Sequence, residues 1–145
     1  MIDVVDRATR SRMMAGIKGK NTKPERFLRS ALHGMGYRYR LGGRGLPGRP
    51  DLVFPARRVV VFVHGCFWHM HDCEYFKWPS NNASFWREKI VGNAARDKQV
   101  HQQLEKAGWK VVVVWECELR RPGYVLPNRA IRRLERILEA RASLR

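Results

Sequence analysis

Apolar residues occur along this chain both in continuous runs and at helical spacing, and these two patterns predict strands and helices. Continuous apolar runs at residues 59–63 and 111–115 are typical of buried central strands. Apolar residues spaced three and four apart predict helices, and turn-rich residues separate the segments. The predicted elements, in the order α-β-β-β-α-β-α, are residues 22–35, 37–41, 50–54, 59–63, 84–107, 109–115 and 127–140. This order predicts an α/β fold in which a mixed sheet is flanked by helices.

The long helix predicted at 84–107 carries an acid on its inward face. The inward stripe, with steps of four and three, consists of Trp86, Ile90, Asn93, Asp97, His101 and Leu104. A buried carboxylate without a partner is unfavourable, so Asp97 needs a histidine or an arginine near the strand ends. A functional pair and a salt bridge that ties the helix to the sheet explain this position equally well.

The charge of the chain narrows the choice of partner. Its 145 residues include 29 Lys and Arg against 13 Asp and Glu, a formal net charge of +16. Such an excess is usual in proteins that bind a polyanion. Nucleic acid is favoured over an anionic membrane, because no apolar stretch is long enough to span a bilayer. The N-terminus lacks the layout of a secretory leader, so we expect a cytoplasmic, nucleoid-associated protein.

The length predicts one domain over residues 21–145, preceded by a basic segment at residues 1–20. Five basic side chains of that segment are expected to hold phosphates rather than read bases. They are Arg7, Arg10, Arg12, Lys18 and Lys20. The N-terminal segment is therefore predicted to contact the backbone of a nucleic acid.

Residues 64–73, directly after the first apolar run, contain three histidines, two cysteines and two large aromatic residues. They leave the end of a central strand, where a sheet presents groups to a ligand. Thiolates and imidazoles gathered there suggest a metal site, catalysis or both. The aromatic pair, Phe67 and Trp68, suggests surfaces on which bases stack.

The three cysteines of the chain cannot all pair with one another, which favours metal ligands over a disulfide framework. Cys117 follows the second apolar run, so it emerges at the same edge as Cys66 if the two runs are neighbouring strands. Cys66, Cys73, Cys117 and one histidine of the cluster would then form a tetrahedral zinc site of the structural kind. The alternative, that the cysteines are small core residues, fits less well with polar, histidine-rich surroundings.

A series of motifs in a fixed order resembles one nuclease family. The motifs are Thr9-Arg10-Ser11, Glu25, Leu46-Pro47-Gly48-Arg49-Pro50-Asp51, Phe62-Val63-His64-Gly65-Cys66-Phe67-Trp68-His69, Phe85-Trp86-Arg87-Glu88-Lys89-Ile90, Asn93 to Asp97, and Trp115-Glu116-Cys117. Together they extend to about Leu119 and resemble the very-short-patch repair (Vsr) mismatch endonucleases of prokaryotes. The resemblance implies a fold similar to that of restriction endonucleases. It also implies nicking of one DNA strand on the 5′ side of the thymine in a T·G mismatch, which arises when 5-methylcytosine deaminates.

The resemblance also implies a catalytic metal. Asp51 would bind Mg²⁺ together with the backbone carbonyl of Val63, at a position where the family commonly has threonine. Water and phosphate oxygens would complete the octahedron that this hard ion prefers. His69 is implied as the general base, with Glu25 nearby to orient the water. Glu25 also forms a capping box with Thr22, which explains its presence without catalysis.

Further roles follow from the same resemblance. His64 stands where the wider nuclease superfamily usually has a lysine, and Asp97 is implied as its partner. An unperturbed imidazole can shuttle protons at neutral pH. His71 is the implied fourth ligand of the zinc. Two neighbouring positions that are often histidine in relatives are Met70 and Asp72 here.

Phe67, Trp68 and Trp86 resemble the aromatic wedge of the family, which enters DNA beside the mismatch from the major groove. Met14 corresponds to an apolar residue that enters from the minor-groove side. Core packing is the alternative for Trp86, because this residue begins the inward stripe. Two further histidines match no motif of the family and are interpreted as ordinary helix residues: His33 and His101.

Two other functions stay open on the sequence alone. One is a zinc-stapled DNA-binding module without catalysis, and the other is a related nuclease that acts on other mismatches or on modified DNA. An enzyme is favoured because a pure binder has no reason to combine acid, base and metal-ligand groups. Those groups are Asp51, His64, His69 and Asp97. The expected partner is double-stranded DNA with a T·G mismatch, bound by a monomer, with mismatch-repair proteins as candidate assistants.

Overall fold

The computed structural model describes residues 21–142 of the chain. The basic segment predicted at residues 1–20 lies outside the described residues. So do the predictions that fall on its side chains, namely Met14, Arg7, Arg10, Arg12, Lys18 and Lys20. The fold and the sites below therefore concern the domain predicted at residues 21–145, as far as residue 142.

The described part contains helices and strands in nearly the predicted order. They are α2 (Lys23–Gly34), β1 (Arg40–Leu41), β2 (Leu52–Phe54), β3 (Val59–His64), α3 (Ala83–Lys106), β4 (Lys110–Trp115), α4 (Glu116–Arg120) and α5 (Arg129–Ala140). The short helix α4, which follows β4 directly, is an addition to the predicted order. Its five residues are too few for an apolar period to appear in the sequence.

Two predicted boundaries are wrong for local reasons. β1 is shorter than the predicted range 37–41, because the Tyr37 amide still donates to the α2 carbonyl of Leu32 at 3.0 Å. Such a bond belongs to the end of a helix rather than to a strand. α5 begins at Arg129 because the Asn128 side chain accepts from two amides of its first turn, at 3.0 and 3.1 Å. Asn128 is therefore an N-cap, for which asparagine is among the preferred residues.

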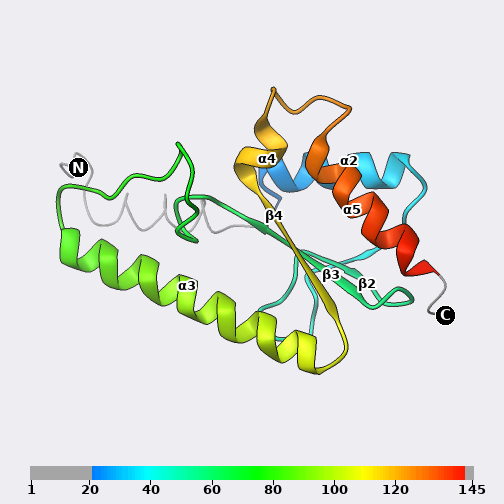
Figure 1. The fold of residues 1–145 in the computed structure, drawn as a ribbon, viewed down its shortest axis with the longest axis horizontal. Coiled ribbons are helices and arrows are strands. Elements are labelled where there is room, and N and C mark those ends of the chain that lie inside the picture. Colours follow the sequence, from blue (N-terminus) through cyan, green and yellow to red (C-terminus); the bar gives the residue numbers. More distant parts are fainter. Residues whose placement is uncertain (1–20, 143–145) are drawn as a thin grey trace.

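The four strands form one mixed sheet in the order β1-β2-β3-β4. The first three strands are antiparallel neighbours, whereas β3 and β4 run parallel, from Val59 opposite Lys110 to His64 opposite Trp115. The two valine-rich runs are therefore neighbouring strands, the condition under which Cys66 and Cys117 were expected at one edge. Because β3 and β4 are parallel and in register, the segments that follow them leave the sheet at the same edge (Figure 1).

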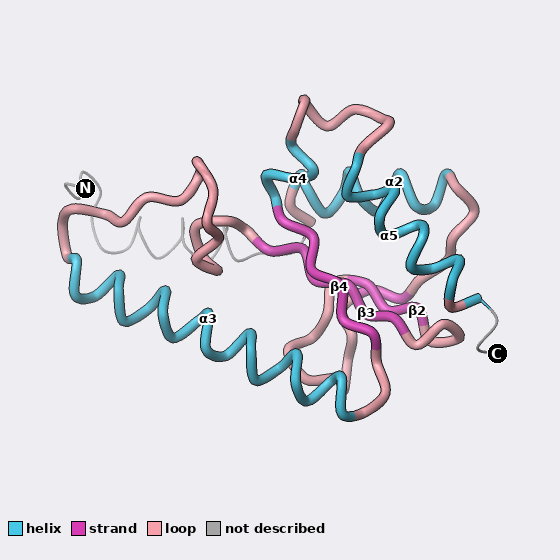
Figure 2. Tube along the Cα trace, viewed as in Figure 1, coloured by secondary structure: helices cyan, strands magenta, loops and turns pink. Residues whose placement is uncertain are grey.

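The sheet separates two layers of helices. Figures 1 and 2 show α3 along one face, and α2, α4 and α5 grouped on the other. The side chains of β2 alternate accordingly: Leu52 and Phe54 pack in the larger core with α2 and α5, whereas Val53 packs with Leu104 of α3. The predicted mixed sheet flanked by helices is therefore correct. None of the helices within residues 21–142 combines the length and the apolar character that crossing a membrane requires.

Candidate functional site

An open cavity of about 660 Å³ lies where α2, the end of β3, the turn after it and α3 meet. All five residues predicted to be catalytic line it, namely Glu25, Asp51, His64, His69 and Asp97. Val63, Phe67 and Trp68 line the same cavity, but Trp86 does not. Residues that are up to 72 positions apart in the sequence are thus brought to one edge of the sheet.

Asp51 immediately precedes β2 and faces the end of β3. The Val63 amide donates a hydrogen bond of 2.7 Å to its Oδ2 atom. Burial raises the pKa of Asp51 to about 6; the Val63 hydrogen bond opposes this rise, and the neighbouring Glu25 carboxylate adds to it. Two carboxylates that destabilise each other in one cavity form a favourable environment for a hard divalent cation.

Glu25 lies at the start of α2 and is buried, with 9% of its surface exposed. The Thr22 hydroxyl accepts from the Glu25 amide at 3.4 Å, so Thr22 caps the helix as predicted. The Glu25 carboxylate accepts from the Asn21 amide at 3.1 Å, one residue earlier than a capping box requires. Glu25 therefore both stabilises the start of α2 and lines the cavity.

Asp97 pairs with His69 rather than with His64, so the predicted partner is wrong. Its Oδ2 atom lies 2.5 Å from His69 Nδ1. The turn after β3 explains why His69 rather than His64 meets Asp97. The His69 amide donates to the Gly65 carbonyl at 3.2 Å, so the turn folds back over the end of the strand. The spacing of α3 places Asp97 on the inward face, but it does not determine which imidazole lies nearer. The imidazole–carboxylate pair that the inward face of α3 forms is therefore His69–Asp97.

His64 lies beneath His69 with the two rings nearly parallel, at a centroid distance of 3.8 Å and an interplanar angle of 3°. Burial, together with the charge of His69, lowers the pKa of His64 to about 3. The imidazole is consequently neutral at physiological pH. The shift disfavours the charged form of the imidazole, which distinguishes His64 from a lysine at the same place.

His101 is a residue that the sequence interpretation missed. Its ring lies 5.9 Å from that of His64 and 5.2 Å from that of Phe62, and burial lowers its pKa. Within residues 21–142, its buried Nε2 atom has no hydrogen-bond partner. Its place on the inward stripe of α3 is the signal that could have identified it, since that stripe meets the histidine cluster at Asp97.

A second cluster lies beside the first. It consists of Cys66, His71, Cys73 and Cys117, and one ligand atom from each lies within 4.8 Å of all the others. The parallel pairing of β3 and β4 brings Cys66 and Cys117 together, as predicted. Burial raises the pKa of both thiols, so without a cation they are protonated. Three thiols and one imidazole suit a tetrahedral ion that prefers sulfur and nitrogen ligands.

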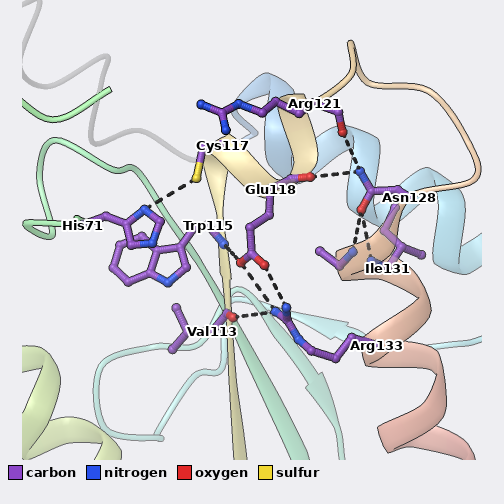
Figure 3. A network of polar contacts seen from close by, with 10 residues as sticks. His71, Val113, Trp115, Cys117, Glu118, Arg121, Asn128, Ile131 and Arg133 are labelled. Carbon is purple, nitrogen blue, oxygen red and sulfur yellow. Dashed lines mark hydrogen bonds and ion pairs between the residues drawn. The ribbon is translucent and has the colours of Figure 1, made fainter. Parts of the chain in front are cut away.

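A polar network fixes α4, the helix that carries Cys117 (Figure 3). Glu118 accepts from the Trp115 amide at 3.0 Å and from Arg133 of α5 at 2.8 Å. Burial opposes the ionisation of Glu118, but these two donors outweigh it and hold the pKa of this carboxyl below its usual value. Trp115 in turn stacks on His71 at 4.0 Å and 7°. The sequence interpretation missed this support, because Glu118 and Arg133 lie 15 residues apart on different elements.

The three aromatic residues predicted to form a wedge contact one another. The ring of Phe67 lies 5.3 Å from that of Trp68 and 5.5 Å from that of Trp86. Trp86 is buried, with 6% of its surface exposed, as the core-packing alternative predicts. Phe67 and Trp68 are half-buried and line the cavity. Of the three, these two are therefore placed beside the carboxylates and imidazoles.

The sequence is similar to known DNA-cleaving enzymes over most of its length. A family model described as "DNA mismatch endonuclease Vsr" matches residues 2–75. The chain is 48% identical over 120 residues to the "DNA mismatch endonuclease Vsr" of Escherichia coli K12, which covers 83% of the chain and 77% of the relative. It is also 48% identical over 119 residues to the "Type II nicking enzyme V.XorIIP" of Xanthomonas oryzae, which covers 82% of the chain and 88% of the relative. With the cavity described above, these matches lead to one conclusion: the chain belongs to the Vsr family of DNA mismatch endonucleases, and it is a DNA endonuclease.

Proposed function

We propose that the protein is a Mg²⁺-dependent enzyme that nicks one DNA strand on the 5′ side of the thymine in a T·G mismatch and so begins very short patch repair. The relatives, a mismatch endonuclease and nicking enzymes, support the mismatch-directed nicking in this proposal. The observation that carries the proposal is the convergence of the Asp51 carboxylate and the His69–Asp97 pair in one cavity.

Asp51 and the backbone carbonyl of Val63 are the residues that would hold Mg²⁺. In an antiparallel pair, the amide and the carbonyl of one residue point to the same neighbouring strand. The Val63 amide already donates to Asp51, so the Val63 carbonyl is directed to the same side. Mg²⁺ would polarise the phosphate and neutralise charge that develops on its oxygens. The substitution of valine for the usual threonine has little effect in this arrangement, because the ligand is a backbone atom.

His69 is proposed as the general base. Its Nδ1 atom is held by Asp97 at 2.5 Å, so Nε2 is the nitrogen free to accept a proton from water. The Asp97 carboxylate also stabilises the imidazolium that forms. His64, a neutral ring stacked under His69, keeps the base in one orientation. Glu25, in the wall of the same cavity, is proposed to orient the attacking water.

Phe67 and Trp68 are proposed to insert beside the mismatch, with Trp86 as the packing platform behind Phe67. A T·G wobble pair stacks less well than a Watson–Crick pair, so separating it from its neighbour is less unfavourable. The aromatic rings adjoin the carboxylate and the imidazoles in one cavity. Recognition of the mismatch and positioning of the scissile phosphate would thus occur in a single docking step.

Cys66, His71, Cys73 and Cys117 are proposed to hold a structural Zn²⁺. All four positions would be protein ligands, which leaves no open position for a reacting water. The alternative reading of the whole protein, a zinc-stapled binder without catalysis, requires the first cluster to have no chemical role. The half-buried Asp51 carboxylate and the imidazole–carboxylate pair argue against that reading.

The proposed specificity is tested by mapping nicks on duplexes labelled on either strand. The duplexes carry T·G, another mispair or no mispair in otherwise identical sequences, and each is incubated with Mg²⁺, with Ca²⁺ or with a chelator and no divalent cation. We expect one nick, 5′ of the mismatched thymine, in Mg²⁺ alone. Equal cleavage of the matched duplex would contradict the mismatch specificity, and undiminished cleavage without a divalent cation would contradict the metal dependence.

A further inference from the structure

A second hollow, of about 560 Å³, follows α2 outside the catalytic cavity. We call it the α2 groove, and its lining residues are Arg26, Arg29, Ser30, His33, Gly34 and Tyr39. No acidic residue is among them. No function described above uses this groove, and its lining is more basic than that of the catalytic cavity, which also contains carboxylates.

The basic side chains of the α2 groove share one face of the helix. Arg26, Arg29 and His33 are spaced three and four apart, so they follow one another along α2. Arg26 and His33 are exposed and Arg29 is half-buried. The ion pairs found among residues 21–142 do not include any of the three. Among the residues that the structure describes, no direct ion pair therefore neutralises the charge of Arg26 or Arg29.

The wall of the α2 groove is held by Tyr39, whose hydroxyl donates to the backbone carbonyl of Arg29 at 3.0 Å. This bond attaches the segment after α2 to the helix beside the Arg29 side chain. The groove is therefore a feature of the packed fold rather than a gap between loosely placed side chains. Its polar atoms belong to residues that donate hydrogen bonds, which suits an anion.

The α2 groove continues the catalytic cavity along the same helix. Thr22, Pro24 and Glu25 line the catalytic cavity, and Arg26 and Arg29 line the groove. Burial raises the pKa of Asp51, and Arg29 is among the positive groups that oppose this rise. The Arg29 charge is thus close enough to act on the catalytic carboxylate. A polyanion that crosses the cavity would meet the groove within about one helical turn.

We propose that the α2 groove holds backbone phosphates of the DNA strand adjacent to the scissile phosphate. This inference rests on the proposed function and adds a binding subsite to it. The span from Arg26 to His33 is roughly 10 Å along the helix axis. One DNA strand carries a phosphate for about every 3.4 Å of duplex axis, and because the strand winds around that axis its phosphates lie further apart than this, so the span matches about two phosphates. An extended strand fits an open groove better than a compact anion does.

The test is the salt dependence of binding, measured for Arg26→Gln, Arg29→Gln and the double variant. Each neutralised phosphate contributes about 0.9 to the slope of log K against log salt. We expect the double variant to lower that slope by about 1.8, so the loss of affinity between about 50 and 200 mM salt shrinks by roughly tenfold. The matched control is Arg132→Gln with Arg136→Gln, two exposed arginines of α5 that line neither cavity.

Shortened duplexes locate the contact. Removing base pairs from the side that the groove binds should lower the DNA affinity of the wild type and leave that of the double variant unchanged. Removing base pairs from the other side should lower the affinity of both proteins equally. An equal slope change in the α5 control, or no change in the α2 variants, would overturn the proposal. A melting curve measured for each variant excludes unfolding as the cause of weak binding.

Two further arms separate the alternatives. Inorganic phosphate is titrated into the wild type and the α2 variants by calorimetry. If phosphate binds the wild type saturably and the α2 variants lose this binding, while their salt slope of DNA binding stays that of the wild type, the groove holds a free anion and the proposal is overturned. Failure of the proposed function has a different signature. In that case the T·G duplex would not be nicked, but the slope difference on any duplex would persist.

Discussion

Replacing the Asp51 carboxylate with an amide should stabilise the fold while it abolishes nicking. The carboxylate is partly buried, and burial raises its pKa from 3.8 to about 6. A shift of this size corresponds to a destabilisation of about 3 kcal/mol when the group is ionised. In Asp51→Asn the amide oxygen can still accept from the Val63 amide. We therefore expect a gain of about 1–3 kcal/mol in the free energy of unfolding at pH 8, without divalent cations.

The pH dependence of that gain provides the sharper test. An acid whose pKa is raised by folding destabilises the folded state at pH values above the folded pKa. The penalty fades as the pH falls from about 6 to 3.8, because the folded protein then takes up the proton first. The advantage of Asp51→Asn should thus be full at pH 8 and nearly absent below about pH 4. His64 titrates in both proteins, so its contribution cancels in the difference.

Urea denaturation of both proteins at several pH values measures this difference. Added Mg²⁺ should stabilise the wild type and not the variant, since only an intact ligand set couples binding to folding. Glu88→Gln, which changes an exposed acid of α3, is the control and should stay within about 0.5 kcal/mol of the wild type. If Asp51→Asn were less stable at pH 8, or if its advantage did not vary with pH, the argument from desolvation would fail.

Three further predictions concern the two clusters. Asp97→Asn should lower the single-turnover nicking rate by about 10²-fold or more while DNA binding changes little, because the pair that orients His69 is lost; a rate near that of the wild type would remove Asp97 from the mechanism. Cys117→Ala should reduce bound zinc well below one ion per chain and lower stability by at least about 2 kcal/mol, as seen by metal analysis and melting; a metal-free variant with an unchanged melting curve would refute the zinc proposal. Trp115→Ala should release zinc faster to a chelator, whereas Trp115→Phe should retain it, because the stacked ring holds His71; equal release rates would exclude that support.

The sequence predicts those parts of the fold that depend on a strong local pattern. The valine-rich runs predict β3 and β4, and the inward stripe of α3 predicts that Asp97 faces the body of the protein. The parallel pairing then brings Cys66 and Cys117 together from 51 positions apart. Resemblance to a family adds the residues that periodicity cannot select, such as Glu25 in the wall of the cavity.

The features that the sequence does not predict depend on how a short segment turns. The fold-back after β3 determines that His69, not His64, meets Asp97, and no spacing rule encodes the rotation of that turn. α4 is a single short helix, so neither its existence nor the Glu118–Arg133 bond can be read from a period. The low pKa of His64 is likewise a consequence of burial under a neighbouring ring.

The separation of the two clusters explains why one sheet edge can carry both. Trp115 stacks on His71 at 4.0 Å and makes a T-shaped contact with His64 at 5.2 Å, so the indole contacts both clusters. The sulfur-rich cluster suits zinc, and the oxygen ligands near Asp51 suit magnesium, so each set selects against the ion of the other. Cys66 and His71 also bracket His69 in the chain. We infer that a metal bound by the cysteines fixes the turn that carries the general base, so loss of that metal should impair nicking through misplacement of His69 even though the metal takes no part in the chemistry.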